Sequence, residues 1–373
     1  GWRDAAEPDS LYLWDAAARA GLSYRTYGEF VGTLSADDVA AFNRRKPKSY
    51  PDVSATVATV PAKQALEANH NEQFRAFDMW TPDAMTAATY AATHLSSMHV
   101  DPLVSLSHAD PRFRGTSRLG AWLDDFRTAV TDLEAGRGDH LPALSILHLP
   151  NDHTVGVTPG LPTPQFHMAD NDYALGRLVE AVSRSPYWTN TAILVVEDDA
   201  QDGPDHVDAH RSPALVISAY SRRGALVHEL HNTVSLIRTM ELLLGIPPMN
   251  QLDAAAIPIT IFQGTADLEP YTARLPEVAL DNLVYAAPTS ARERYWVDQT
   301  ARMALTTPDA AHPRLLNEAI WFSVRGDSRQ MPEPQRLAAF DVMRATIDEE
   351  RAEGARKPLW MARLALERLA RAR

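Results

Sequence analysis

The residues from position 143 to 196 alternate between strand and helix patterns, and this alternation leaves few folds open to the chain. Residues 143–149 are a short, mostly apolar run of the kind that forms a strand. Over residues 170–183 the apolar side chains recur at the spacing of one helix face: Leu175, Leu178, Val179 and Val182. A second apolar run, residues 192–196, predicts the next strand. Strand, helix and strand in this order favour a parallel sheet with a right-handed crossover, so we expect an α/β fold.

Shorter patterns before this unit predict further elements. Residues 11–20 have the pattern of a helix that Gly21 ends, and residues 23–28 have that of a strand. Residues 76–140 are expected to be helical in part, and three side chains would share one helix face: Trp122, Phe126 and Val130. Predicted helices therefore lie both before and after the first predicted strand along the chain.

Three more elements are predicted after the unit. The apolar run 214–218 predicts a strand that turns back near the same sheet edge. Asn232 or Thr233 then caps a helix that ends at Gly245. The tail from residue 358 to 373 has the pattern of a basic amphipathic helix. We expect that helix to dock on the body of the protein rather than on a membrane surface.

The segment that follows residues 192–196 is unusually acidic. Residues 197–210 contain six carboxylates and two histidines, and no Lys or Arg lies between Arg184 and Arg211. Two like charges about 4 Å apart repel by about 4 kcal/mol at an effective dielectric constant near 20. Open solvent, raised pKa values or a bound cation would relieve this repulsion. A cation also accounts for the two histidines, so we favour it.

Acidic and imidazole groups follow both strands of the unit. Functional loops of a parallel sheet gather beyond the carboxyl ends of its strands, so two pairs should meet there: Asp152 with His153, and Asp198 with Asp199. His206 and His210 lie in the same segment as Asp198 and can reach this edge. Oxygen and imidazole ligands without sulfur suit zinc, manganese, iron or calcium, and the residues do not select among them.

Ordinary structural roles compete with this interpretation. A histidine such as His153, taken alone, is more often a hydrogen-bonded loop residue than a metal ligand, and Asp198 alone would be a solvated turn residue or a helix cap. The placement of both at one edge is what favours the ion. Residues 228–231, His-Glu-Leu-His, are one residue short of the H-E-x-x-H motif of zinc proteases.

The composition excludes several classes of function. The 373 residues carry a net charge of −12, and binding to nucleic acid needs a basic surface, so nucleic acid is not an expected partner. No apolar stretch approaches the roughly 20 residues that span a bilayer, so we expect no transmembrane segment. The lack of cysteine excludes disulfides, thiolate nucleophiles and cysteine-bound zinc.

Six stretches of the chain resemble one known family. They are Tyr-Leu-Trp-Asp at 12–15 with Ser-Tyr-Arg-Thr-Tyr-Gly-Glu-Phe at 23–30, Leu-Pro-Asn-Asp-His-Thr at 149–154, Ala-Asp-Asn-Asp at 169–172 with Gly176, and residues 188–199, 205–211 and 216–224. In this order and spacing the chain, from about residue 10 to 330, resembles the phosphoesterase branch of the alkaline phosphatase superfamily. That branch includes phospholipase C-like and acid phosphatase-like proteins.

The resemblance implies a three-layer α/β/α sandwich with a mostly parallel central sheet, and a metal-dependent hydrolase of a small or lipid phosphoester. In the superfamily a strand ends in an Asp-His or similar pair that binds metal, the place that Asp198 and Asp199 hold here. His206 or His210 matches the histidine before the next strand, and His153 matches an earlier loop histidine. The resemblance favours divalent ions, zinc before manganese, iron or calcium.

Three further residues are candidates for roles behind these ligands or at the substrate: Asp152, Glu197 and Arg211. Arg211 would meet a carboxylate or the substrate phosphate. The resemblance also implies export to the periplasm or beyond, and some members of the branch are fused to a β-propeller, which here would lie upstream.

The chain departs from the family in one respect. The family's first metal ligand and its nucleophile lie before the segment that begins at Trp14, and the preceding residues here offer no such motif. We expect the nucleophile upstream of Gly1, a phosphoesterase domain over residues 1–330 that is incomplete at its N-terminus, and a helical tail over 331–373. The alternative is a non-catalytic metal-binding or scaffolding module that lacks the nucleophile. A sulfatase is a weaker alternative, because its signature motif is absent.

Overall fold

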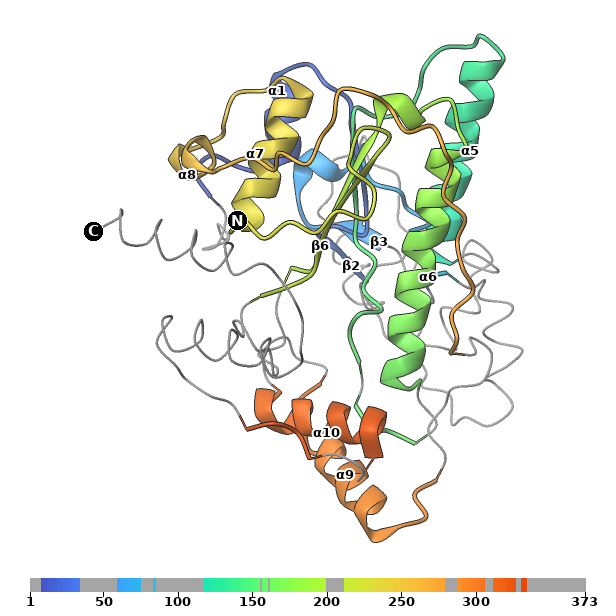
Figure 1. Ribbon diagram of the computed structural model, residues 1–373, viewed down its shortest axis with the longest axis vertical. Helices are drawn as coiled ribbons and strands as arrows, with labels where there is room; N and C mark the ends of the chain where they lie inside the picture. Colours follow the sequence, from blue (N-terminus) through green and yellow to red (C-terminus); the bar gives the residue numbers. More distant parts are fainter. Residues whose placement is uncertain are drawn as a thin grey trace, which may run out of the picture.

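The computed structural model places helices around short paired strands (Figure 1). It describes residues 8–33, 59–74, 83–84, 117–154, 156–159, 162–198, 211–278, 287–305, 311–326 and 330–333. Both helices and strands are present and one strand pair is parallel, which confirms the α/β class. The predicted tail helix over residues 358–373 lies outside the described residues.

The two strands β1 (Tyr24–Tyr27) and β4 (Leu144–Leu147) form the parallel pair. Tyr24 lies opposite Leu144 and Tyr27 opposite Leu147, and the backbone N of His148 donates to the carbonyl of Tyr27 at 2.9 Å. Both predicted strands are therefore confirmed. Because the pair is parallel, the residues that follow β1 and β4 emerge at the same edge.

The strands β5 (Ala192–Val196) and β6 (Ala214–Ser218) pair in antiparallel register. The sequence prediction that the second strand turns back beside the first is confirmed. Within the described residues β4 is paired with β1 and β5 with β6, so the predicted unit over 143–196 is not a directly hydrogen-bonded parallel pair. A second antiparallel pair joins β2 (Val31–Thr33) to β3 (Thr59–Pro61).

Side chains that alternate along the strands pack against helices on both sides. On one side Tyr27 and Ile193 belong to the largest apolar cluster, together with side chains of α5 (Arg118–Glu134) and α6 (Pro164–Ser183). On the other side Tyr24 packs with α1 (Leu13–Arg19) and α7 (Thr233–Leu244), and Leu194 packs near Leu236 of α7. This alternation has the period of two that a strand with two covered faces requires. Figure 1 shows α5 and α6 side by side, with α1 and α7 across the strands from them.

The helix α6 begins earlier than the sequence pattern predicts. Its first residue is Pro164, and the hydroxyl of Thr163 accepts a hydrogen bond from the Phe166 backbone N at 3.2 Å, as an N-cap should. The polar residues 170–172 interrupt the apolar period, so the periodic pattern becomes visible only after them. The caps of α7 match the prediction, because Asn232 caps its start and Gly245 ends it with a φ of 69°.

The remaining elements complete the described part of the chain. They are η1 (Gln64–Leu66), η3 (Trp188–Asn190), α8 (Gln251–Ala255), α9 (Ala291–Ala301) and α10 (Pro313–Arg325). The helices α9 and α10 pack on each other, and Val157, in the stretch after His153, packs with Trp296 of α9. None of the helices in the described ranges has the length and apolar character needed to cross a membrane.

Candidate metal and substrate site

The loop after β4 holds the His153 ring in one orientation. The Pro150 carbonyl oxygen accepts from the backbone N of His153 at 3.1 Å and lies 3.0 Å from its Nδ1, while Asp152 Oδ1 lies 2.9 Å from the same Nδ1. Two acceptors at Nδ1 place the proton there, so Nε2 carries the lone pair of the neutral ring. A histidine oriented by a carboxylate and a carbonyl in this way is typical of metal ligands.

The surroundings of His153 also affect its charge. The hydrogen bond with Asp152 raises the pKa of His153, and the charges of Asp152 and Asp198 raise it further, against the opposing effect of burial. The side chain is about half exposed, at 49%. His153 is therefore both oriented by the protein and accessible from solvent.

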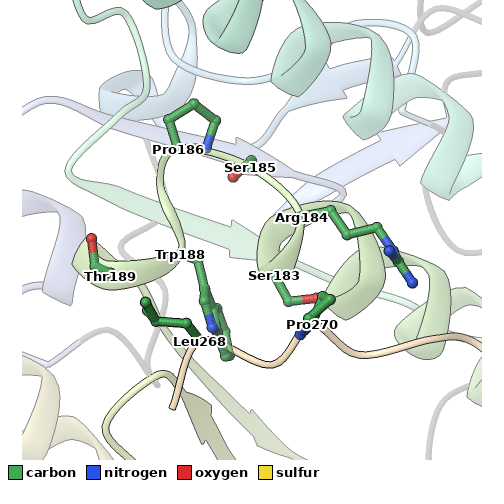
Figure 2. A pocket seen from close by; sticks show the side chains of 8 residues that line it. All are labelled: Ser183, Arg184, Ser185, Pro186, Trp188, Thr189, Leu268 and Pro270. Atoms are coloured by element: carbon green, nitrogen blue, oxygen red, sulfur yellow. The ribbon is translucent and has the colours of Figure 1, made fainter. Parts of the chain in front are cut away.

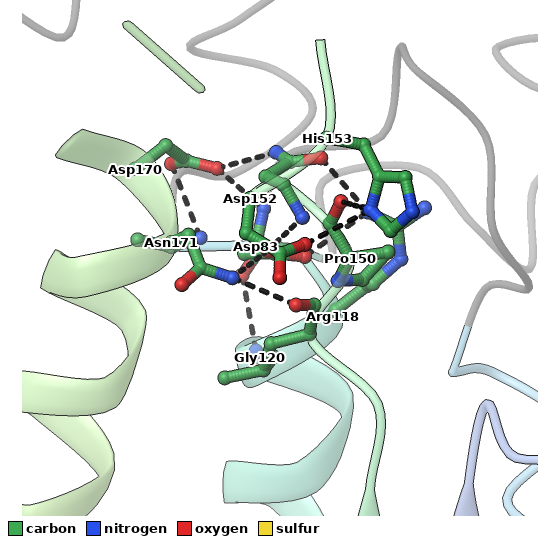
Figure 3. Close-up of polar contacts among 12 residues, drawn as sticks. Asp83, Arg118, Gly120, Pro150, Asp152, His153, Asp170 and Asn171 are labelled. Carbon is green, nitrogen blue, oxygen red and sulfur yellow. Dashed lines mark hydrogen bonds and ion pairs between the residues drawn. The ribbon is translucent and has the colours of Figure 1, made fainter. Parts of the chain in front are cut away.

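Beneath this loop lies a buried polar network that sequence reasoning missed (Figure 3). Asn151 is 2% exposed; its backbone N donates to Asp83 Oδ2 at 2.9 Å and its Nδ2 donates to Asp170 Oδ2 at 2.8 Å. Asn171 Nδ2 donates to the Leu149 carbonyl at 2.7 Å. Asp170 and Asn171 belong to α6, so the helix holds the loop from below.

Arg118 of α5 supplies the positive charge in this network. Its Nη1 lies 3.0 Å from Asp83 Oδ1, and both side chains are fully buried. Asp170 also accepts from the backbone N of Asp83 at 2.6 Å. Burial and the charge of Asp83 raise the pKa of Asp170 to about 6, and burial raises the pKa of Asp83 despite its contact with Arg118. The family-like stretches at 149–154 and 169–172 contain Asn151, Asp170 and Asn171, but Asp83 lies far from both in sequence.

The end of β5 lies close to the loop after β4. Burial raises the pKa of Glu197, and so do the charges of Asp152 and Asp198, while the charge of His153 lowers it. The charge of Asp198 acts in turn on His153. Charges act on one another in this way only when the groups lie near each other. Four of the residues predicted from the sequence are therefore neighbours: Asp152, His153, Glu197 and Asp198.

The ends of β1 and β4 add two residues that were not predicted, Glu29 after β1 and His148 after β4. Burial raises the pKa of Glu29, the charge of His148 lowers it, and the charge of Asp198 raises it. Glu29 lies between two residues with left-handed backbones, Gly28 at φ 86° and Phe30 at φ 47°. A carboxylate at this edge was discoverable in principle from the pairing of β1 with β4, but the sequence does not reveal which strands pair.

The other residues predicted for the site are not among these four. Asp199, His206 and His210 lie outside the described residues, whereas Arg211 is described and exposed. Within the described ranges, no three His, Asp or Glu side chains are grouped closely enough to hold a metal ion. The donors that do meet here are carboxylates and a ring nitrogen with its lone pair outward, which fit a divalent cation chemically.

A surface hollow of about 390 Å³ lies elsewhere (Figure 2). It is lined by Ser183, Arg184, Ser185, Pro186, Trp188, Thr189, Leu268 and Pro270. Trp188 and Thr189 precede β5, whereas Asp198 follows it. The hollow is therefore separate from the candidate site.

A comparison with known protein families matches part of the chain. The Phosphoesterase family model matches residues 162–247. This range begins just before α6 and ends just after α7, and it contains Glu197, Asp198 and Arg211. No curated protein matches the chain.

The match supports a phosphoesterase family and suggests phosphoester hydrolysis. The matched range contains the end of β5 and the acidic segment after it, together with Asp170 and Asn171 of the buried network. His153 and Glu29 lie outside the range. Their connection with the phosphoesterase segment comes from the folded structure, which brings the ends of β1 and β4 to the end of β5.

Proposed function

We propose that this protein is a metal-dependent phosphoester hydrolase whose metal centre lies where β4 and β5 end. His153 and Asp198 are the proposed ligands within the described residues. Asp199, His206 and His210 complete the proposed set. Zinc is the first candidate ion, with manganese, iron or calcium as alternatives.

One observation carries this proposal: Asp152 Oδ1 and the Pro150 carbonyl hold Nδ1 of the His153 ring at 2.9 and 3.0 Å, in the loop after β4. Leu147 of β4 packs in the same apolar cluster as Ile193 of β5, the strand that Asp198 follows, and the charge of Asp198 raises the pKa of His153. The Phosphoesterase match over residues 162–247 supports the same chemistry from an independent direction. The packing of helices against both faces of the strands supports a three-layer α/β/α sandwich as the complete fold.

Each residue of the site has a distinct proposed task. Asp152 holds the proton on Nδ1 of His153, so that Nε2 faces outward as the ligand atom. Glu197 adds negative charge behind Asp198, and Arg211 would contact the phosphate oxygens of the substrate. A bound divalent ion would polarise the phosphoryl oxygens and lower the pKa of the attacking group.

Metal content and hydrolysis test the proposal together. The protein, in a form that includes any residues encoded upstream of Gly1, is purified, analysed for bound metals and assayed with p-nitrophenyl phosphate and bis-p-nitrophenyl phosphate. Zinc, manganese and calcium are added in separate assays. We expect bound metal, metal-dependent turnover of one ester, and a loss of at least about 100-fold in turnover for Asp198→Ala.

Two results would count against the proposal. Turnover that survives in Asp198→Ala removes this carboxylate from the metal centre. Metal binding without turnover of either ester favours a non-catalytic metal-binding module instead. Glu72→Ala is a suitable control, because Glu72 is an exposed carboxylate outside the site.

A further inference from the structure

The peptide unit between Pro150 and Asn151 links the buried network to His153. The carbonyl oxygen of this unit is the Pro150 acceptor at Nδ1 of His153, and its N–H donates to Asp83 Oδ2. A peptide unit is planar, so a hydrogen bond that fixes its N–H also fixes the direction of its carbonyl. Asp83 therefore acts on the His153 ring without touching it.

The Asn151 side chain fixes the same unit from a second direction. Its Nδ2 donates to Asp170, and its Oδ1 accepts from Arg118 Nη1 at 3.4 Å. On the other side of Pro150, the Leu149 carbonyl accepts from Asn171. The loop backbone is thus held on both sides of the carbonyl that contacts His153.

Stability alone gives a poor account of this arrangement. Two carboxylates are buried here: Asp83 lies against the guanidinium of Arg118, and Asp170 accepts from the backbone N of Asp83. Asp83 and Arg118 have no exposed side-chain surface. Replacing a buried ionic cluster by apolar side chains of similar volume is often neutral or stabilises a protein by about 1–4 kcal/mol. Fixed placement of the loop is a function that apolar packing would not supply.

We propose that Asp83 and Asn151 are positioning residues of the metal site: they fix the Pro150 carbonyl, which together with Asp152 holds the His153 ring in the tautomer and orientation that a metal ion requires. This inference rests on the proposed function, because the orientation matters only if His153 is a ligand. Arg118 of α5 contacts Asp83 and Asp170 of α6 contacts Asn151, so both helices support that loop.

The test compares Asn151→Ala with the wild-type chain by two measurements. Nitrogen-15 NMR of histidine-labelled, metal-free protein reports the His153 tautomer at a pH of about 9, where the ring is neutral. His153→Gln assigns the signal among the 13 histidines. Calorimetric titration with Zn²⁺ reports the affinity. We expect the wild-type ring to carry its proton on Nδ1, and Asn151→Ala to show a tautomer mixture and a roughly 10- to 100-fold weaker zinc affinity.

A matched control removes a buried hydrogen-bonding group away from the loop. Thr239 is buried, donates to the Ser235 carbonyl and accepts from the Ile259 backbone N. Thr239→Val should lower stability while it leaves the His153 tautomer and the zinc affinity at their wild-type values. Asp83→Asn is measured in the same two ways, because it changes the acceptor of the residue 151 N–H, and it replaces Asn151→Ala should that variant not fold.

The outcomes separate this inference from the proposed function. Wild-type tautomer and wild-type zinc affinity in both Asn151→Ala and Asp83→Asn would show that the network has only a structural role, because the backbone N–H of residue 151 can still donate to Asp83 in Asn151→Ala. If the wild-type chain binds no zinc, the proposed metal centre fails, and the positioning of a ligand fails with it. If the tautomer nevertheless changes in Asn151→Ala, the network orients the His153 ring even though the ring binds no metal.

Discussion

Among single residues near the site, Gly28 has little space around its Cα. Its φ of 86° lies in the left-handed region, and a Cβ placed on it would come within 2.9 Å of the Phe74 ring. Phe74 is fully buried, and the same Cβ would lie 3.5 Å from that of His148. The turn that carries Glu29 therefore depends on the absence of a side chain at its first position.

Gly28→Ala should destabilise the protein more than Gly21→Ala does. Both glycines have a positive φ, but nothing lies within 4 Å of a Cβ at Gly21. The backbone strain is thus common to both variants, and the contact with Phe74 adds about 1–3 kcal/mol to the loss in Gly28→Ala. Urea unfolding of the two variants measures the difference. Equal losses would mean that Phe74 moves aside without cost.

At this scale the sequence revealed the polar groups at the ends of strands but not those beneath a loop. His153 and Asp198 were predicted to meet because each comes after an apolar run, and the charge of Asp198 does act on His153. Glu29 was missed because its nearness to His148 depends on the pairing of β1 with β4, which involves residues far apart in sequence. Asp83 was missed because its partners are distant and its neighbours form no pattern.

Among the elements, α6 combines an apolar face with a polar patch that is also buried. Ala174, Leu178 and Val182 belong to the main cluster, while Asp170 is fully buried beside the loop after β4. The helix therefore has two tasks, to cover the strands and to hold the loop. The second task costs free energy, because Asp170 has to be accommodated near Asp83 away from water.

The pH dependence of stability should report this cost. The pKa of Asp170 is raised from its usual 3.8 to about 6, so the folded state binds the proton more tightly than the unfolded state. Its contribution to stability is complete below about pH 3.8 and is lost as the pH rises through 6, a change of about 3 kcal/mol.

Asp170→Asn should remove this part of the pH dependence from the free energy of unfolding. Urea unfolding at a series of pH values from about 4 to 7 measures it. Asp172→Asn, at an exposed position of the same helix, is the control and should retain the wild-type slope. An unchanged slope in Asp170→Asn would place the proton on another group.

Predictability differed between the elements for a physical reason. The strands β5 and β6 were predicted with their observed bounds, because mostly apolar runs between polar segments have clear ends. The start of α6 was placed late, because buried polar residues disturb the periodicity on which the prediction depends. The sequence thus obscures the part of the helix that contacts the site.

Over the whole molecule, the candidate site lies between two strand pairs. His153 follows β4 of the β1–β4 pair and Asp198 follows β5 of the β5–β6 pair, and within the described residues no backbone ladder joins the two pairs. A metal ion held by both side chains would link these pairs directly. The proposed centre would then affect global stability as well as catalysis.

Zinc should therefore raise the stability of the wild-type chain. At a free concentration of about 100 times its dissociation constant, an ion that binds only the folded state adds about 2.7 kcal/mol. The midpoint of thermal unfolding should rise with zinc and return to its original value with excess EDTA. Asp198→Asn should lose most of this response, and an equal response in that variant would place the zinc elsewhere.

The β5–β6 ladder holds the two ends of the acidic segment together, and this bears on protein engineering. Val196 pairs with Ala214, and the backbone N of Glu197 donates to the Pro213 carbonyl at 3.3 Å, so the ladder keeps both ends of the intervening segment together. Once its ends are fixed, doubling the length of such a connection costs only about 0.6 kcal/mol of chain entropy. An insertion between positions 198 and 213 should therefore leave the β5–β6 hairpin folded, while it changes the spacing of the proposed ligands Asp199, His206 and His210.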